Sequence, residues 1–272
     1  RISTGVVLGT GTVDAGAGTA DRLIVTADAA VASTTLGARY SNFEVLQVAN
    51  GVSVDVDNLS ANNSFTGARY TDGGVITDMN STMAANVVVT TGGNSATFGI
   101  KNATNPGTID TLNINANDGT ATGARSTIDL GTPVATGVEK INLTATDNIV
   151  VGAFTSAASI DTLGLSGAGT ITVTSGALAV NANTVVNGEA ATGVTTLDFS
   201  AATGRGVDIT TGSAADVIAS TAVANLGDVM DGGAGADRII GDSNAEVQTL
   251  TLVGQVAADG AGVGTLVING TT

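Results

Sequence analysis

The sequence has no cysteine and no histidine among its 272 residues. A Ser-His-Asp triad, a cysteine nucleophile and an H-E-x-x-H zinc site are therefore all excluded. Neither a G-x-S-x-G elbow nor a P-loop is present. Two carboxylates can hydrolyse glycosides, but the aromatic and basic residues that usually hold a sugar are scarce. We therefore expect no enzymatic activity.

Tryptophan is also missing, aromatic residues make up 3% of the chain, and only 9 basic residues face 24 acidic ones. The resulting net charge of −15 argues against nucleic acid as a partner, because phosphate-binding surfaces need clustered Lys and Arg. No run approaches the ~18 apolar residues of a spanning helix, so we expect no membrane insertion. Because disulfides are excluded, an exported protein of this sequence would benefit from another cross-link, such as a bound cation.

What the chain does contain favours strands and turns. Apolar residues reach 43%, and 38 glycines are accompanied by only 2 prolines. The apolar residues are mostly Ala, Val, Ile and Leu, and Thr, Asn, Asp and Gly fill the gaps between short apolar runs. These are the residues typical of strands and turns, so the sequence predicts an all-β fold without long helices.

A short motif recurs in which an apolar residue precedes an acidic or polar one, and two further apolar residues stand two positions apart. The copies begin 66, 29, 22 and 34 residues after one another, and they cover residues 43–48, 109–114, 138–143, 160–165 and 194–199. Such spacing suits a right-handed parallel β-helix, a solenoid in which each coil stacks on the next. The first gap has room for two more coils. A β-sandwich is the competing fold.

The motif makes a specific structural prediction. The strands that begin near residues 109, 138 and 160 should stack with Leu112, Ile141 and Leu163 in one internal column. Further strands are expected at 52–56, 86–90, 170–174 and 207–210. Turn residues follow each motif strand, among them Asp118 and Asp147. These two acids are turn-formers satisfied by backbone amides, or else additional calcium ligands.

The strongest local signal is the nonapeptide Gly232–Ile240, which matches the pattern G-G-x-G-x-D-x-U-x of calcium-binding β-rolls at every fixed position. Its glycines permit a tight turn with positive φ. We expect Asp237 and the carbonyl groups of Gly233 and Gly235 to bind Ca²⁺, since this cation takes carboxylate and carbonyl oxygens.

Neighbouring acids extend this signal. Asp228 and Glu246 lie nine residues on either side of Asp237, which in a β-roll with 18-residue coils places them one coil apart as a second site. Upstream, residues 212–218 form a degraded copy of the nonapeptide, which is displaced by three residues from the nine-residue spacing. The segment 13–24 parallels 230–240 with one extra residue, and an ordinary Gly-rich turn explains it equally well. The remaining candidate ligands are Asp231, Asp242, Asp216, Asp14 and Asp21.

Because of this nonapeptide, the chain resembles the RTX proteins, which are exported by type I secretion. With its Thr/Ala/Gly/Asn-rich composition and the phrases at 137–147 and 194–201, it resembles the RTX-type surface-layer proteins of Gram-negative bacteria. That resemblance implies a secreted structural protein at the cell surface whose subunits fold and join through Ca²⁺ into a two-dimensional lattice. It also implies an anchor to lipopolysaccharide through regions outside these residues. The alternative is a stalk or passenger region of an RTX adhesin or biofilm protein.

The predicted organisation has four parts. Residues 1–25 form an RTX-like entry turn with the first strands, and residues 26–210 form the coils of the solenoid. Residues 211–246 form the calcium-binding β-roll, and residues 247–272 begin a further β segment. Because the chain starts at Arg1 without a signal-like segment, we interpret it as an internal part of a longer protein.

Overall fold

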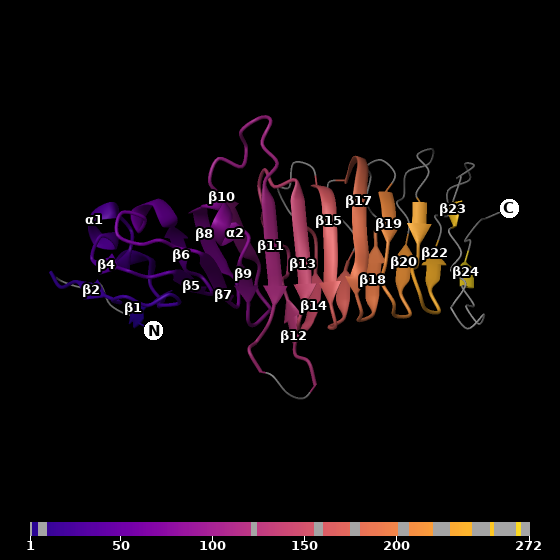
Figure 1. The fold of residues 1–272 in the computed structure, drawn as a ribbon, viewed down its shortest axis with the longest axis horizontal. Coiled ribbons are helices and arrows are strands. Elements are labelled where there is room, and N and C mark those ends of the chain that lie inside the picture. The colour runs from indigo at the N-terminus through magenta and orange to yellow at the C-terminus, as the bar shows by residue number, and fades with distance from the viewer. Residues whose placement is uncertain are drawn as a thin grey trace.

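The chain winds into a long stack of parallel β-coils, shown along its axis in Figure 1. The structure is a computed structural model that describes residues 2–4, 10–120, 124–154, 160–174, 180–200, 207–219, 229–240, 251–252 and 265–267. Every pairing between the described strands is parallel. This confirms the predicted parallel β-solenoid and excludes the β-sandwich for this part of the chain.

Two long sheets form the walls of the solenoid: successive coils each add a strand to the larger one, and from β12 onward they also add a strand to the other. The larger sheet has twelve strands: β1 (Ile2–Thr4), β3 (Arg22–Val25), β5 (Val45–Ala49), β7 (Gly67–Thr71), β9 (Val87–Val89), β11 (Thr111–Ala116), β13 (Lys140–Ala145), β15 (Ile160–Gly167), β17 (Val180–Ala191), β19 (Val207–Thr210), β21 (Val229–Asp231) and β23 (Thr251–Leu252). The other has seven: β12 (Thr127–Asp129), β14 (Asn148–Val151), β16 (Ile171–Val173), β18 (Thr195–Asp198), β20 (Val217–Ala219), β22 (Arg238–Ile240) and β24 (Thr265–Val267).

The N-terminal half adds smaller elements. A three-stranded sheet contains β10 (Ala96–Ile100), β8 (Gly74–Met79) and β6 (Ser53–Asp55), and β2 (Val13–Asp14) pairs with β4 (Tyr40–Ser41). Helical segments in the described residues are single turns: η1 (Asp28–Ala30), α1 (Thr34–Gly37), η2 (Val56–Asn58) and α2 (Ser81–Ala84). The prediction that long helices are absent is therefore confirmed for the described chain.

The predicted internal column is present. Leu112 on β11 lies opposite Ile141 on β13, and Ile141 lies opposite Leu163 on β15. All three side chains are fully buried. The column continues through Val186 and Ile209, so one apolar stack runs along the wall. Side chains that alternate between the two faces of each strand place every second residue in this core.

Two details of the predicted coil order are settled by the strand pairings. The 66-residue gap does contain two further coils, because β7 and β9 lie between β5 and β11 in the larger sheet. The copy at 194–199, however, does not belong with the other four, because it forms β18 of the seven-stranded sheet. The two walls enclose the same core, so their strands have the same apolar alternation and the motif cannot tell them apart.

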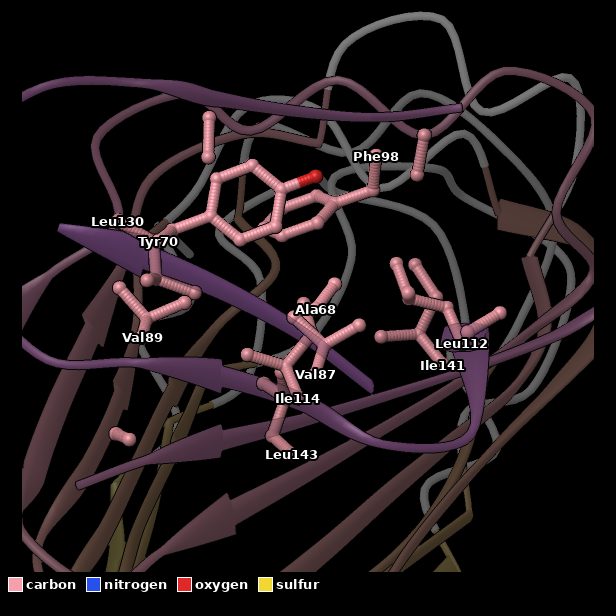
Figure 2. Packing of buried hydrophobic residues seen from close by; sticks show 14 of the residues in the cluster. Ala68, Tyr70, Val87, Val89, Phe98, Leu112, Ile114, Leu130, Ile141 and Leu143 are labelled. Carbon is pink, nitrogen blue, oxygen red and sulfur yellow. The ribbon is translucent and has the colours of Figure 1, made fainter. Parts of the chain in front are cut away.

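The core of the N-terminal half contains larger side chains than the Ala-, Val-, Ile- and Leu-rich composition of the chain suggested. Tyr70 and Phe98 pack edge to face with ring centroids 4.8 Å apart, and Figure 2 shows them above the aliphatic stack of Ala68, Val87 and Ile114. The Tyr70 hydroxyl donates to the Thr97 carbonyl at 2.9 Å, which satisfies its polar atom inside the core. Two of the few aromatic side chains of the chain thus pack on one another inside the core, next to the three-stranded sheet.

Candidate cation sites

The nonapeptide forms a corner of the solenoid between β21 and β22. Gly233 has φ +72° and Gly235 has φ +138°, values that side chains with a Cβ rarely adopt. A Cβ at Gly233 would collide with the carbonyl of Gly212, and one at Gly235 with the carbonyl of Ala214. These glycines are required because consecutive coils approach closely at this corner, as the predicted tight turn demands.

The corner acids Asp216 and Asp237 stack on one another. Asp237 Oδ1 accepts a hydrogen bond from the backbone N–H of Asp216 at 2.9 Å. Asp216 Oδ1 in turn accepts from the backbone N–H of Thr195 at 2.6 Å. The supposedly degraded copy at 212–218 is therefore the preceding coil of the same corner.

The predicted 18-residue coil is wrong for this part of the chain. Val217 on β20 pairs with Arg238 on β22, so one coil takes 21 residues. The 21-residue spacing places Asp216 directly beneath Asp237, and it removes the basis for pairing Asp228 with Glu246 one coil apart. Asp228, Glu246 and Asp242 lie outside the described residues. The coils here continue the solenoid instead of tightening into a narrower roll.

Asp216 is a buried carboxylate with one orphaned oxygen. Its side chain is 1% exposed, and Oδ2 has no hydrogen-bond partner in the described structure. The nearby Thr211 hydroxyl donates to the carbonyl of Gly232 at 2.8 Å. Burial raises the pKa of Asp216, and the charge of Asp237 raises it further, while the hydrogen bond from the Thr195 N–H and the nearby polar groups of Thr211 and Gly212 oppose the rise.

Two further acids bear on the electrostatics of this corner. Burial raises the pKa of Asp237, and the neighbouring charge of Asp231 adds to the rise. Asp231 Oδ1 accepts from the N–H of Gly233 at 2.9 Å, an Asx-type turn. Of the ten predicted ligand residues, Asp216, Asp231, Asp237, Gly233 and Gly235 thus gather at one corner of two stacked coils.

The N-terminal candidates lie at a separate corner. Asp14 Oδ1 accepts from Gly16 N–H at 2.9 Å and from Asn42 Nδ2 at 2.7 Å, and the Asn42 bond is the main reason that the pKa of Asp14 is lowered. The Asp21 carboxylate folds against Gly18, where a Cβ would collide with it. No described contact joins Asp14 to Asp21.

Carboxylates elsewhere in the stack also accept hydrogen bonds from backbone N–H groups. Glu44 Oε2 accepts from the N–H of Asp21, Glu139 Oε2 from that of Asp110, and Asp147 Oδ2 from that of Asp118, at 2.8 to 2.9 Å. Each bond joins one coil to the preceding one. Asp118 also accepts from Ser126 and from Thr120, and these bonds lower its pKa to about 2. The turn-former interpretation of Asp118 and Asp147 is thus the one that the contacts support.

One acidic cluster was not predicted. Carboxylate oxygens of Asp55, Asp57 and Asp78 lie within 4.8 Å of one another beside the three-stranded sheet. The Lys101 ammonium contacts both oxygens of Asp57, at 2.6 and 2.7 Å, and so supplies a positive charge there. The Asp-Val-Asp spacing was visible in the sequence, but only the pairing of β6 with β8 brings Asp78 to it.

The chain has no match among models of known protein families, curated proteins or solved structures. Among the described residues, no helix has the length and apolar character needed to cross a lipid bilayer.

Proposed function

We propose that this chain is a non-enzymatic module of a calcium-dependent bacterial surface protein, and that it acts as a structural subunit of a self-assembling surface layer. The observation that carries the proposal is the stack of Asp216 and Asp237, in which a buried carboxylate oxygen has no partner beneath an intact calcium-binding nonapeptide. A long wall of stacked parallel strands suits a building element.

The proposed calcium ion would be held by the stacked Asp216 and Asp237 carboxylates. The nonapeptide glycines let the backbone carbonyls of the preceding coil, at Gly212 and Ala214, approach this corner closely, and carboxylate and carbonyl oxygens are the ligands that Ca²⁺ prefers. A cation would neutralise acids whose mutual repulsion and burial disfavour their charged forms. Binding to the folded chain alone then stabilises it, and this stabilisation grows with the logarithm of the ion concentration once that concentration exceeds Kd.

Removing Asp237 tests the calcium site. We expect Asp237→Ala to shift the midpoint of a calcium titration, followed by circular dichroism or calorimetry, to roughly tenfold higher concentration, because one charged ligand is lost. Extracellular calcium modules bind at ~10⁻⁴–10⁻³ M. Asp161→Ala changes an exposed acid of β15 far from this corner and should leave the midpoint in place. Equal titration of wild type and Asp237→Ala would make Asp237 a turn residue only.

Assembly is a separate expectation. Millimolar Ca²⁺ should cause the full chain to scatter light and to form ordered two-dimensional arrays in electron micrographs, whereas EGTA should keep it dispersed. Scattering that stays flat across this range would favour the second candidate function, the stalk of an RTX adhesin. For that candidate the long stack of similar coils is the supporting observation, since a stalk needs length and not lateral contacts.

A further inference from the structure

Charge divides the outer face of the twelve-stranded sheet into two parts. Within β3, β5, β7, β9, β11 and β13 every charged side chain is positive, namely Arg22, Arg69 and Lys140. Each is at least partly exposed beside a buried neighbour, so all three point away from the core. Within β15, β17, β19 and β21 every charged side chain is acidic: Asp161, Glu189, Asp208 and Asp231.

The three basic groups lack a counterion within the described structure, where none of them forms an ion pair or a side-chain hydrogen bond. Burial lowers the pKa of Arg69, and the positive charge of Arg22 lowers it further. An anion from outside the chain would offset this repulsion. The acids that directly precede these strands accept hydrogen bonds or fold against other parts of the chain instead of pairing with the basic groups: Asp21, Glu44, Asp110 and Glu139.

Two adjoining hollows lie on this basic part of the face. The larger, of about 530 Å³, has both arginines in its lining. Asn86 and Val88 belong to the linings of both hollows, so the two are continuous and form one groove. The smaller hollow, of about 370 Å³, also includes side chains with amide and hydroxyl groups: Asn113, Asn115, Asn142 and Thr144.

The basic groups are spread along this groove. Arg22 is level with Gly67 two strands away, and Arg69 lies two residues beyond Gly67, so the arginine Cα atoms are roughly 12 Å apart. Arg69 Nη2 reaches the turn after β11, where it lies 3.9 Å from the position that a Cβ of Gly119 would take. Five strand spacings place Lys140 roughly 24 Å from Arg22 across the sheet. Single charges separated in this way suit a ligand with charges repeated along a chain.

Unused hydrogen-bonding groups lie between these charges. Asn142 Nδ2 donates to Asn113 Oδ1 at 2.7 Å, and the Thr146 hydroxyl donates to Asn115 Oδ1 at 2.9 Å. Asn142 Oδ1 and Asn115 Nδ2 have no hydrogen-bond partner within the described chain. A sugar hydroxyl both donates and accepts, so it suits a free amide oxygen and a free amide nitrogen equally well.

We propose that this groove binds an acidic oligosaccharide whose sugars carry carboxylates, as uronic acids do. Arg22, Arg69 and Lys140 bind the carboxylates, and the asparagines between them bind hydroxyl groups. The planar fork of a guanidinium matches a planar carboxylate. Because aromatic residues are absent from the described linings of both hollows, the affinity rests on charge and hydrogen bonds and falls with salt.

Isothermal titration calorimetry of the full chain with pentagalacturonate tests this groove. Titration in EGTA and ~0.1 M salt excludes calcium and screens the distant acids. We expect saturable binding to the wild type. Arg22→Gln combined with Arg69→Gln should raise the dissociation constant at least about tenfold, because two charge-assisted contacts are lost. Arg238→Gln removes an exposed arginine from β22 of the other sheet and should leave the constant within about twofold.

Other ligands and a further variant separate charge from sugar recognition. Fully methyl-esterified pentagalacturonate keeps its hydroxyl groups without the charges, and it should bind at least about tenfold more weakly. Inorganic phosphate should also bind at least about tenfold more weakly, because it cannot reach the separated charges at once. Asn142→Ala should raise the dissociation constant for pentagalacturonate roughly threefold with every charge in place.

The outcomes are independent of the calcium corner. A wild type that does not bind pentagalacturonate, or equal dissociation constants for wild type and the double arginine variant, would overturn the proposal. Phosphate that binds as tightly as pentagalacturonate would overturn the oligosaccharide as ligand. Circular dichroism of each variant shows whether its solenoid is intact, so unfolding is not mistaken for lost binding. Because every titration contains EGTA, failure here leaves the calcium-dependent function standing, and success does not depend on it.

Discussion

Replacing Ile160 with alanine is expected to destabilise the solenoid by roughly 2–5 kcal/mol. Ile160 is the first apolar residue of its motif copy, and its side chain is fully buried between coils. Truncation removes its apolar surface from the core and leaves a cavity, because stacked coils held by hydrogen-bonded ladders on both sides relax only partly. Urea unfolding followed by circular dichroism measures the change in the free energy of unfolding.

The matched control is the same substitution at the same motif position. Ile109 begins the copy at 109–114, yet its side chain is 75% exposed. Ile109→Ala should therefore change the free energy of unfolding by no more than about 0.5 kcal/mol. Equal losses for the two variants would mean that Ile109 is buried in solution and that the chain before β11 is placed differently.

The contrast between these isoleucines shows how far the motif predicts the fold. The last two apolar residues of each copy face the core in all four copies of the larger sheet, because strand alternation is a local property. The first apolar residue of the motif is buried in three copies, where it is Phe43, Val138 or Ile160, but it is exposed in the fourth, where it is Ile109. Ile109 belongs to the segment between β10 and β11, which projects from the stack (Figure 1). The local apolar pattern does not predict where a connecting segment leaves the sheet.

The candidate site divides in the same way. The glycine positions of the nonapeptide follow from backbone sterics, and the sequence predicted that they form a tight turn. The sequence did not predict which residue stacks beneath Asp237, because that depends on the length of the coil. Nine-residue spacing suggested an 18-residue coil, whereas the strand pairing at this corner gives a coil of 21 residues and places Asp216 beneath Asp237.

Replacing Asp216 with asparagine should change stability in opposite directions with and without calcium. Without calcium at neutral pH, we expect Asp216→Asn to be roughly 1–2 kcal/mol more stable than wild type, since a buried charge without a full set of partners is removed. The asparagine oxygen can still accept the hydrogen bond from Thr195. In saturating calcium the order should reverse, because the wild type gains binding free energy that the variant largely loses.

The pH dependence gives the same test a second measurement. The pKa of Asp216 is raised in the folded chain, so the folded state binds its proton more tightly than the unfolded state does. Stability of the calcium-free wild type should therefore increase as the pH falls from 7 toward the ordinary aspartate range near 4. Asp118, whose pKa is lowered to about 2, has the opposite sign and should reduce stability only below that range.

The variant separates Asp216 from the other acids. The gain in stability between pH 7 and pH 4 should be smaller for Asp216→Asn than for wild type in EGTA, and Asp237 should supply what remains. Asp161→Asn, at an exposed position of β15, should keep the wild-type profile. If Asp216→Asn is less stable than wild type at pH 7 without calcium, the buried carboxylate is already compensated within the folded chain. A cation would then have no unbalanced charge to neutralise at this corner, and the calcium proposal would lose its main support.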